Sequence, residues 1–379
     1  MNEAITFDDV LIKPKFSTIE SRKDVDLSVK ALGLDLKLGI ISANMDTVTD
    51  SKMAIAMSQN GAVGCLHRFM SIDENLNEFR RVVLGEAQQI MCSVGLGKKE
   101  LERADALVGE GGCTSIIIDV ANGASMSVVN QVKELREYLG DDFYITVGNF
   151  ATAESVETFL SYVRREHVQG IKIGIGPGSR CKTRTVTGIG YPQLSAIMDI
   201  SRILKNTGIK VIADGGLNSS GDCAKALGAG AHILMSGSFF AGTEESPGET
   251  VWKGNGWAGE SFLTKEEAWP QKRNSDGTFS FMEDFVIELP AYKKYRGSAS
   301  KESYEDQGKT GTHRAPEGDC VYIPHKGLVK DVLQQLEGGI RSSFTYTDSR
   351  NLEQFHKNCE FVRVSTNTVV ENGTRNGVK

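Results

Sequence analysis

Short runs of apolar, mostly β-branched residues recur between residues 38 and 240, and each run ends near glycine, aspartate, asparagine or serine. Each run holds four to six apolar residues with little alternation, which is typical of a strand buried on both faces. The pattern therefore predicts eight strands, at 38–46, 61–67, 89–97, 114–123, 143–149, 170–178, 210–216 and 231–238.

Helical patterns lie between these runs. In residues 126–140 the apolar positions fall on one helix face, namely Val128, Val129, Val132, Leu135 and Leu139. Further helices are predicted at 51–60, 100–111, 153–167 and 191–206. Strand and helix alternate with a period of roughly 25 residues, and eight strands close a barrel, whereas a doubly wound sheet usually has fewer. The sequence thus predicts an α/β fold, a single (β/α)₈ TIM barrel.

The alternation stops after residue 240. Residues 251–291 hold all three tryptophans, Trp252, Trp257 and Trp269, and predict an insertion with a hairpin turn in KRNSDGTFSF. Residues 297–318 are polar, contain glycine and have almost no apolar anchor, which predicts a mobile flap.

The end of the sequence predicts a helix at 329–339 and a strand in EFVRVS at 360–365. We expect residues 1–365 to form a single catalytic domain and residues 366–379 to form a flexible tail.

Composition narrows the class of protein. The 379 residues are 40% hydrophobic and 24% charged, as in soluble globular proteins. We expect no membrane span, since no run of about 18 apolar residues occurs. A net charge of −6 without a basic block argues against nucleic acid as a partner, but not against one bound nucleotide. The acidic start lacks signal-peptide features, and the seven cysteines are scattered without CxxC, so we expect a cytoplasmic protein with reduced thiols.

The glycine-rich loop 174–184, GIGPGSRCKTR, is the most informative segment. Glycine permits unusual dihedral angles, so backbone groups can turn toward an ion or ligand. Nearby positive charges favour the thiolate form of Cys181, and the loop supplies Arg180, Lys182 and Arg184. The loop predicts a nucleophilic cysteine, with a small buried hydrophobic residue as the alternative.

Two glycine turns follow the last two predicted strands, Asp214-Gly215-Gly216 and Ser236-Gly237-Ser238. Turns at these strands form the usual phosphate site of the barrel. A carboxylate repels phosphate, so ribose hydroxyls are the better partner for Asp214. The alternative is that the glycines only make tight turns.

Two further positions leave their roles open. Asp119 ends the fourth predicted strand, where it could hold a ribose or a nicotinamide amide, or cap a helix. His67 and Arg68 could hold a cofactor phosphate or form an ordinary surface pair. No residue set has zinc spacing, and no GxGxxG follows a strand.

Together these segments resemble the family of IMP dehydrogenase and GMP reductase. The resemblance rests on ITFDDVLIKP, SANMDTV, GIGPGSRCKTR, IADGG, the Tyr295-Arg-Gly segment and the PEG at 316–318. The family fold is the (β/α)₈ barrel. IMP dehydrogenases commonly carry a CBS module after the second strand, but only a short link follows GAVGCLHRF, so we expect that module to be absent.

The branch of the family is harder to choose. DVANG, TGIGYPQLSA, RAPEG and GGIRSSFTY resemble GMP reductase, whereas the front half, with FMSID, is more similar to a dehydrogenase. The dehydrogenase hydrolyses its intermediate with an Arg-Tyr pair in a long flap, and this sequence has no Arg-Tyr dipeptide and a short flap. The resemblance therefore favours an NADPH-dependent GMP reductase. An IMP dehydrogenase without CBS domains and a non-catalytic purine-nucleotide-binding barrel remain as alternatives.

The resemblance also implies roles for residues. Cys181 would attack C2 of GMP, and Thr183 and Glu317 would relay the proton that lets ammonia leave. The implied substrate residues are Asp214, Gly215, Gly216, Gly237, Ser238, Gly297, Ser298, Ala299, Arg314, Ala315, Pro316 and Gly318. The implied cofactor residues are Ser21, Arg22, Arg68, Asp119, Val120, Ala121, Ile175 and Gly176. A potassium site at Gly176, Gly178, Cys181 and Arg184 and a homotetramer are implied as well.

Several residues depart from the family pattern. Arg180 stands where a small or apolar residue is common, and Lys182 stands in place of threonine, so both should add charge beside the nucleophile. Arg68 stands where many reductases have lysine, and Ser236 stands in place of an apolar residue. The 251–291 insertion fits neither branch.

Overall fold

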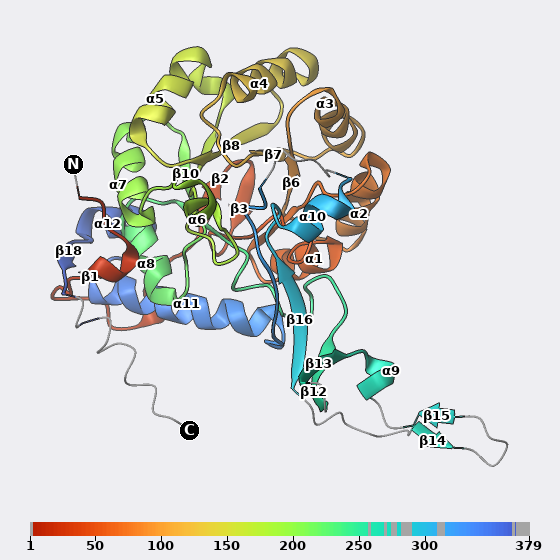
Figure 1. Cartoon of the computed structure of the whole chain (residues 1–379). Coiled ribbons are helices and arrows are strands. Elements are labelled where there is room, and N and C mark those ends of the chain that lie inside the picture. Colours follow the sequence, from red (N-terminus) through yellow and green to blue (C-terminus); the bar gives the residue numbers. More distant parts are fainter. Residues whose placement is uncertain are drawn as a thin grey trace.

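A computed structural model describes residues 3–256, 259–268, 271–273, 279–281, 290–308, 315–365 and 368. Eight parallel strands close into a barrel in the order β10-β11-β4-β5-β6-β7-β8-β9 (Figure 1). They are β4 (Ile40–Ser42), β5 (Val63–Leu66), β6 (Ile90–Val94), β7 (Ser115–Asp119), β8 (Tyr144–Phe150), β9 (Gly170–Ile173), β10 (Lys210–Asp214) and β11 (Ile233–Ser236). Seven of the predicted runs contain one of these strands and the run at 143–149 overlaps β8, so the predicted (β/α)₈ barrel is confirmed.

Alternation along the strands divides the core into an outer layer and a barrel interior. On β7, Ile116 and Ile118 pack outward under the helices, while Ile117 belongs to the interior cluster. A hairpin of β2 (Val29–Ala31) and β3 (Leu34–Leu36) contributes leucines to that same interior cluster. The hairpin leads into the start of β4 and packs into the barrel interior from that side, so it closes the N-terminal end of the barrel. The C-terminal mouth is left for a ligand.

Helices cover the barrel (Figure 1). They are α1 (Ser51–Gln59), α2 (Ile72–Leu84), α3 (Lys98–Ala104), α4 (Met126–Leu139), α5 (Ala153–Tyr162), α7 (Gln193–Leu204), α8 (Ser220–Gly228) and α11 (Val329–Tyr346). The helices predicted at 51–60, 100–111, 126–140, 153–167 and 191–206 are confirmed, and α3 continues as a π-helical turn. Only five residues, His67 to Ser71, connect the end of β5 to α2, so a CBS module has no place there.

The helix predicted at 329–339 is confirmed but is longer than predicted. It continues through two glycines because Ile340 and Phe344 extend its buried face. Gly339 lies against α8, where a Cβ atom would come within 2.1 Å of Ser220 Oγ. The predicted strand at 360–365 is also confirmed, since β18 (Phe361–Arg363) pairs with β1 (Val10–Ile12).

The segment predicted as an insertion forms strands beside the barrel. β13 (Gly259–Leu263), β12 (Val251–Gly256), β16 (Ala291–Arg296) and β17 (Cys320–Pro324) make one sheet in this order. The predicted hairpin is confirmed, as β14 (Gln271–Arg273) pairs with β15 (Phe279–Phe281). Its turn, Trp257 and Trp269 lie outside the described residues.

The segment 297–318, predicted as a flap without regular structure, contains the helix α10 (Lys301–Asp306). Sequence reasoning missed it because it is short and has no apolar face. Ser300 caps it by accepting a hydrogen bond from Ser303 N, and both serines are buried. Residues 309–314, including Arg314, and the 366–379 tail apart from Thr368 lie outside the described residues.

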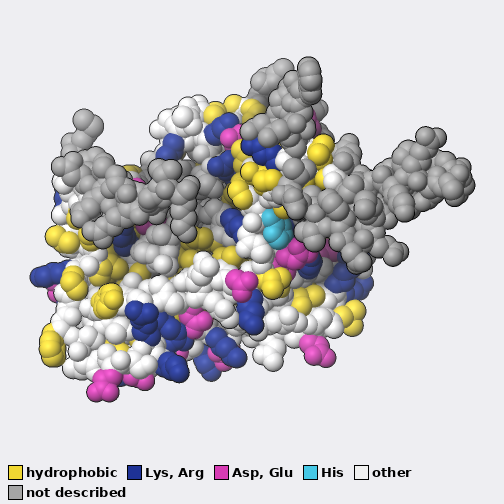
Figure 2. All heavy atoms as spheres, turned by 90° about the horizontal axis from the view of Figure 1, so that it is seen from below, with side chains coloured by type: hydrophobic (Ala, Val, Ile, Leu, Met, Phe, Trp, Pro, Cys, Tyr) yellow, Lys and Arg dark blue, Asp and Glu magenta, His cyan; other side chains and the backbone are white. Residues whose placement is uncertain are grey.

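The surface carries mixed charge. On the face shown in Figure 2, basic and acidic side chains are interspersed among hydrophobic and uncharged ones. Within the described ranges, every helix is too short or too polar to cross a membrane.

Candidate active site

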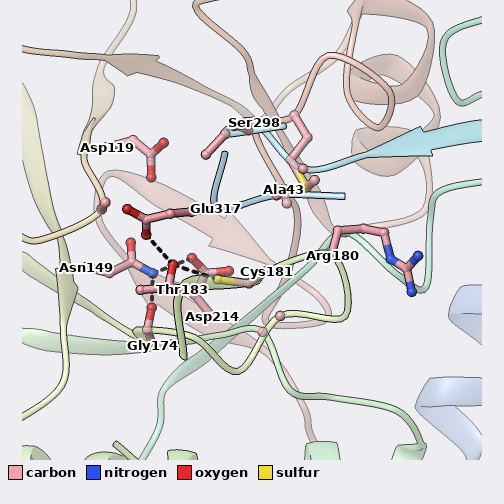
Figure 3. A pocket seen from close by; sticks show the side chains of 18 of the residues that line it. Ala43, Asp119, Asn149, Gly174, Arg180, Cys181, Thr183, Asp214, Ser298 and Glu317 are labelled. Atoms are coloured by element: carbon pink, nitrogen blue, oxygen red, sulfur yellow. Dashed lines mark hydrogen bonds between the residues drawn. The ribbon is translucent and has the colours of Figure 1, made fainter. Parts of the chain in front are cut away.

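A cavity of about 390 Å³ opens at the C-terminal ends of the barrel strands. Residues at or just after the C-terminal ends of seven of the eight strands line it, together with parts of 295–307 and 317–318. Figure 3 shows the labelled side chains around it, among them Cys181, Thr183, Glu317, Asp119 and Asp214. The predicted position of the site, at the mouth of the barrel, therefore agrees with the cavity.

The cysteine loop is held by close backbone contacts. Gly174 has φ +147°, and a Cβ atom there would come within 2.1 Å of the backbone oxygen of Asp214. Only glycine fits this approach, which packs the loop onto the end of β10. Further along, Cys181 forms an antiparallel bridge with Gly318, and Lys182 N donates to Glu317 O (2.6 Å).

This bridge brings a distant acid to the cysteine. The Cys181 thiol donates to Thr183 Oγ1 (3.1 Å), and Thr183 Oγ1 donates to Glu317 Oε2 (2.6 Å). The dashed lines in Figure 3 follow this path. Cys181 is exposed, so the alternative of a small buried hydrophobic residue is wrong at this position. Four other cysteines are buried, namely Cys65, Cys92, Cys113 and Cys223.

The basic residues around Cys181 are engaged elsewhere. The Arg180 guanidinium lies over the Tyr295 ring (5.7 Å), and Figure 3 shows it directed away from Cys181. Lys182 Nζ pairs with Asp319 Oδ1 (3.1 Å), and Arg184 Nη2 donates to Tyr191 O (2.7 Å). The three positive charges are therefore paired with groups other than the Cys181 thiol. The thiol instead donates a hydrogen bond to Thr183.

Sequence reasoning missed Lys172 and Asn149, which lie at the floor of the cavity. Lys172 Nζ donates to Asp119 Oδ1 (2.8 Å), Asp214 Oδ2 (2.6 Å) and Asn149 Oδ1 (2.5 Å). Asn149 Nδ2 also donates to Asp214 Oδ2 (2.9 Å) and Gly174 O (2.6 Å). The available signal was a lysine in the middle of an apolar strand, Ile171-Lys172-Ile173.

The charges of this cluster support one another. Burial alone would raise the pKa of Asp119, but the Lys172 ammonium, its hydrogen bond and Arg68 outweigh burial and lower it. Burial opposes the charge of Lys172, but Asp119 and Asp214 together raise the pKa of this lysine. The cluster therefore holds an ionised lysine beside the ionised Asp119.

The two glycine turns lie together at one end of the cavity. Gly215 and Gly216 have φ +81° and +75°. A Cβ atom on Gly237 would come within 2.8 Å of both Met45 Sδ and Tyr295 Oη. Gly215 and Gly237 line the cavity, while Ser238 Oγ lies 3.3 Å from Ser236 Oγ. Ser236 also accepts from Phe239 N (3.3 Å), so its hydroxyl shapes this turn where the family has an apolar residue.

The other end of the cavity holds most of the implied cofactor residues, Arg68, Asp119, Val120, Ala121, Ile175 and Gly176. Arg68 Nε is buried without a hydrogen-bond partner, as expected of a donor that meets a ligand. Ser21 and Arg22 do not line the cavity; they form a turn in which Ser21 Oγ accepts from Lys23 N.

The remaining implied residues fall in three groups. Gly297, Ser298, Ala299 and Gly318 line the cavity, Ala315 and Pro316 are exposed, and Arg314 is outside the described residues.

In the implied potassium site, Gly178 O accepts from Cys181 N and Arg184 O accepts from Gly188 N. Each carbonyl keeps a second lone pair for a further contact.

His67 does not belong to an ordinary surface pair. It is buried, and its Nδ1 accepts from Phe69 N (3.1 Å). Burial, opposed by Asp46, lowers the pKa of His67 to about 4. It is therefore a buried, neutral residue rather than a surface residue.

An exposed cysteine on a glycine-supported loop, a hydrogen-bonded path from it to a carboxylate, and paired glycine turns at the mouth of a (β/α)₈ barrel are typical of an enzyme that binds a nucleotide. The chain belongs to the IMP dehydrogenase / GMP reductase family, whose domain matches residues 4–262 and 278–375. The unmatched residues, 263–277, lie within the predicted insertion, so 251–262 and 278–291 are part of the family domain.

Relatives carry the names of two enzymes. A GMP reductase of Vibrio vulnificus is 33% identical over 365 residues, covering 94% of this chain and 94% of that protein. An inosine-5'-monophosphate dehydrogenase of Cryptosporidium parvum is 30% identical over 420 residues, covering 98% and 94%. Another from Nitrosopumilus maritimus is 28% identical over 487 residues, covering 96% of each. The family consists of oxidoreductases that act on purine nucleotides with nicotinamide cofactors.

Proposed function

We propose that this protein is a GMP reductase, which converts GMP to IMP and ammonia with NADPH. The observation that carries the proposal is the hydrogen-bonded path from Cys181 through Thr183 to Glu317. A reductive deamination needs a nucleophile and a group that delivers a proton to the departing amine. The path supplies both within one chain of contacts.

The steps follow from these contacts. Thr183 and Glu317 take the proton of the Cys181 thiol, and the sulfur forms a bond to C2 of the guanine ring. The same path returns the proton to the amino group, and the C2–N bond breaks to release ammonia. A thioimidate between C2 and Cys181 remains. NADPH, when bound, supplies a hydride to C2. The S–C2 bond then breaks, IMP leaves, and the thiolate recovers a proton from solvent.

Binding is proposed at the two ends of the cavity. Gly215, Gly216, Gly237 and Ser238 would hold the phosphate, and Asp214 would accept from the ribose hydroxyls. Gly297 to Ala299 and Arg314 to Gly318 would close over the nucleotide. Arg68, Asp119 to Ala121, Ile175 and Gly176 would hold the dinucleotide. The unpaired Arg68 Nε supports a ligand at that end.

The second candidate is an IMP dehydrogenase, favoured by relatives of that name that match almost the whole chain. It would need a base to activate water, and the sequence has no Arg-Tyr dipeptide for that task. The reductase needs no such base.

Absorbance of the reduced nicotinamide separates the candidates. GMP with NADPH should cause a loss of signal, whereas a gain with IMP and NAD would establish the dehydrogenase. No change with either pair would favour a non-catalytic barrel. The Cys181→Ala variant should lose turnover but still bind GMP, and activity retained in that variant would rule out the covalent step.

Three further properties belong to the proposal: a bound potassium ion, a homotetramer and a cytoplasmic location. A cofactor role for Ser21 and Arg22 requires a second copy of the chain, because they do not line the cavity of their own copy. Activity in potassium against lithium or choline salts tests the ion. Light scattering of the purified protein tests the tetramer.

A further inference from the structure

Lys172 is a charged residue in the interior of the barrel. Its neighbours on β9, Ile171 and Ile173, pack in the outer layer, so alternation turns the lysine inward. Its side chain is 2% exposed. A buried ammonium is costly unless it is paired and fully hydrogen-bonded, so its partners account for its presence.

Those partners use every donor of the ammonium. An ammonium has three N–H groups, and Lys172 Nζ contacts three acceptors, on Asp119, Asn149 and Asp214. Asp119 ends β7 and Asp214 ends β10, and β8 and β9 lie between these two strands in the barrel. The contacts of Lys172 therefore span the barrel mouth. Lys172 thus ties together two carboxylates from strands that do not touch.

The two carboxylates remain accessible to ligands. Their side chains are 21% and 20% exposed, against 2% for the lysine. Both line the cavity. Asp119 belongs to the residues proposed to hold the dinucleotide, and Asp214 is proposed to accept from the ribose hydroxyls. The lysine lies beneath them, where it can hold both but is shielded from solvent.

Resting on the proposed function, we infer that Lys172 is a positioning residue of this enzyme, which holds the carboxylates of Asp119 and Asp214 at fixed places under the nucleotide and the dinucleotide and places a positive charge between them. It does not touch the reacting atoms. Its effect on turnover passes through the two carboxylates that do contact ligands.

Other groups around the pair cannot replace the lysine. Arg68 also faces Asp119, but its Nη2 donates to the backbone oxygen (3.5 Å). The Cys65 thiol and the Tyr295 phenol face the cluster as well, and burial raises the pKa of both, so both stay neutral and supply no charge. Glu317 and Cys181 share the cavity and add no positive charge.

Removal of the ammonium should therefore change the protonation of the site. Without the ammonium the two carboxylates face each other with no cation between them, and their repulsion favours uptake of a proton by the pair. Ribose hydroxyls bind best to an ionised acceptor. In Lys172→Met the affinity for GMP and IMP should fall as the pH falls, relative to the wild type.

The experiment measures the dissociation constants of GMP and IMP by calorimetry from about pH 8.5 to about pH 4.5, a range that includes the upper pKa known for carboxylate pairs. The ratio of variant to wild type should rise by roughly tenfold for each pH unit below the raised pKa of the pair. The nucleotide phosphate titrates equally in both proteins, so it cancels in the ratio. Lys172→Arg, which keeps the charge, should restore most of the affinity and a flat ratio.

Lys293→Met is the matched control. Lys293 is also a buried lysine, 4% exposed, but its Nζ donates to the backbone oxygens of Glu244 (3.2 Å) and Ser246 (2.7 Å). Its loss should leave the ratio flat with pH. The same flat ratio in Lys172→Met, in a wild type that binds and turns over GMP, would overturn the inference while leaving the proposed function intact.

A second variant covers a failure to fold. If Lys172→Met is not folded by circular dichroism, the double variant Asp119→Asn with Lys172→Met leaves one carboxylate and no repulsion, and it should fold and bind with a flat ratio. A steep pH dependence in that double variant would contradict the inference. Failure of the wild type to bind either nucleotide would instead remove the proposed function.

Discussion

The thiol of Cys181 donates to Thr183, and Thr183 donates in turn to Glu317, so three side chains form one proton path. Thr183 is two residues from the cysteine, but Glu317 comes from a segment after β16. The backbone hydrogen bond from Lys182 N to Glu317 O holds the segment of Glu317 beside the cysteine loop. The Glu317 carboxylate therefore lies within hydrogen-bond distance of Thr183. At this scale, the proposed function depends on one contact between distant segments.

Loss of the acid should slow turnover without removing binding. Glu317→Gln keeps the shape but cannot hold the proton, so we expect kcat to fall by about 10²- to 10⁴-fold with a small change in KM. Steady-state kinetics with GMP measure this. Glu305→Gln, an exposed acid of α10 in the same segment, is the control and should be near wild type. Equal effects of both variants would argue against a specific role for Glu317.

The basic residues beside the thiol should contribute little to its reactivity. Arg180 and Lys182 are directed to Tyr295 and Asp319, and charges at the surface are screened by salt. In 0.15 M salt, Arg180→Ala and Lys182→Ala should alter the rate of alkylation of Cys181 by less than about threefold. A tenfold slower rate in either variant would restore the charge-based account of the nucleophile.

At the scale of elements, packing decides where helices end and which glycines are needed. α11 runs through Gly338 and Gly339 because its buried face continues to Phe344. The two glycines differ in surroundings. A Cβ atom on Gly339 would lie 2.4 Å from Ser220 Cβ on α8, while one on Gly338 would have no neighbour within 4 Å among the described residues.

Substitution of these adjacent glycines should have opposite effects on stability. Gly339→Ala forces α8 and α11 apart, and overpacking of this kind costs about 1–3 kcal/mol. Gly338→Ala gains helix propensity and should add about 1 kcal/mol. Urea unfolding midpoints measure both. If the two variants shift the unfolding midpoint in the same direction, the result would argue against a close contact between α8 and α11.

At the scale of the whole molecule, a closed barrel collects side chains from many strands at one mouth. The same closure buries titratable groups, among them His67, whose pKa burial lowers to about 4. In the unfolded chain histidine titrates near 6.5. Between these two pH values the unfolded chain therefore binds a proton at His67, and the folded protein does not.

Stability should therefore fall as the pH falls from about 6.5 to about 4, because protonation favours the unfolded chain. His67 alone accounts for about 3 kcal/mol over this window, from its shift and the value of one pKa unit. Asn offers an oxygen in place of Nδ1, so His67→Asn should flatten the dependence. Thermal unfolding across this pH range is the measurement, and an unchanged slope in the variant would show that His67 is not the group responsible.

The sequence by itself determined the barrel and the cysteine loop, because buried strands and glycine turns follow from local composition and spacing. The eight apolar runs and the helix of residues 126–140 could be predicted for this reason. Only the tertiary structure decided that Lys172 bridges Asp119 and Asp214, that Arg180 turns away from Cys181, and that α10 forms in a polar segment. Each of these depends on residues far apart in the chain, and side-chain direction and pairing across a closed sheet arise only when distant strands meet.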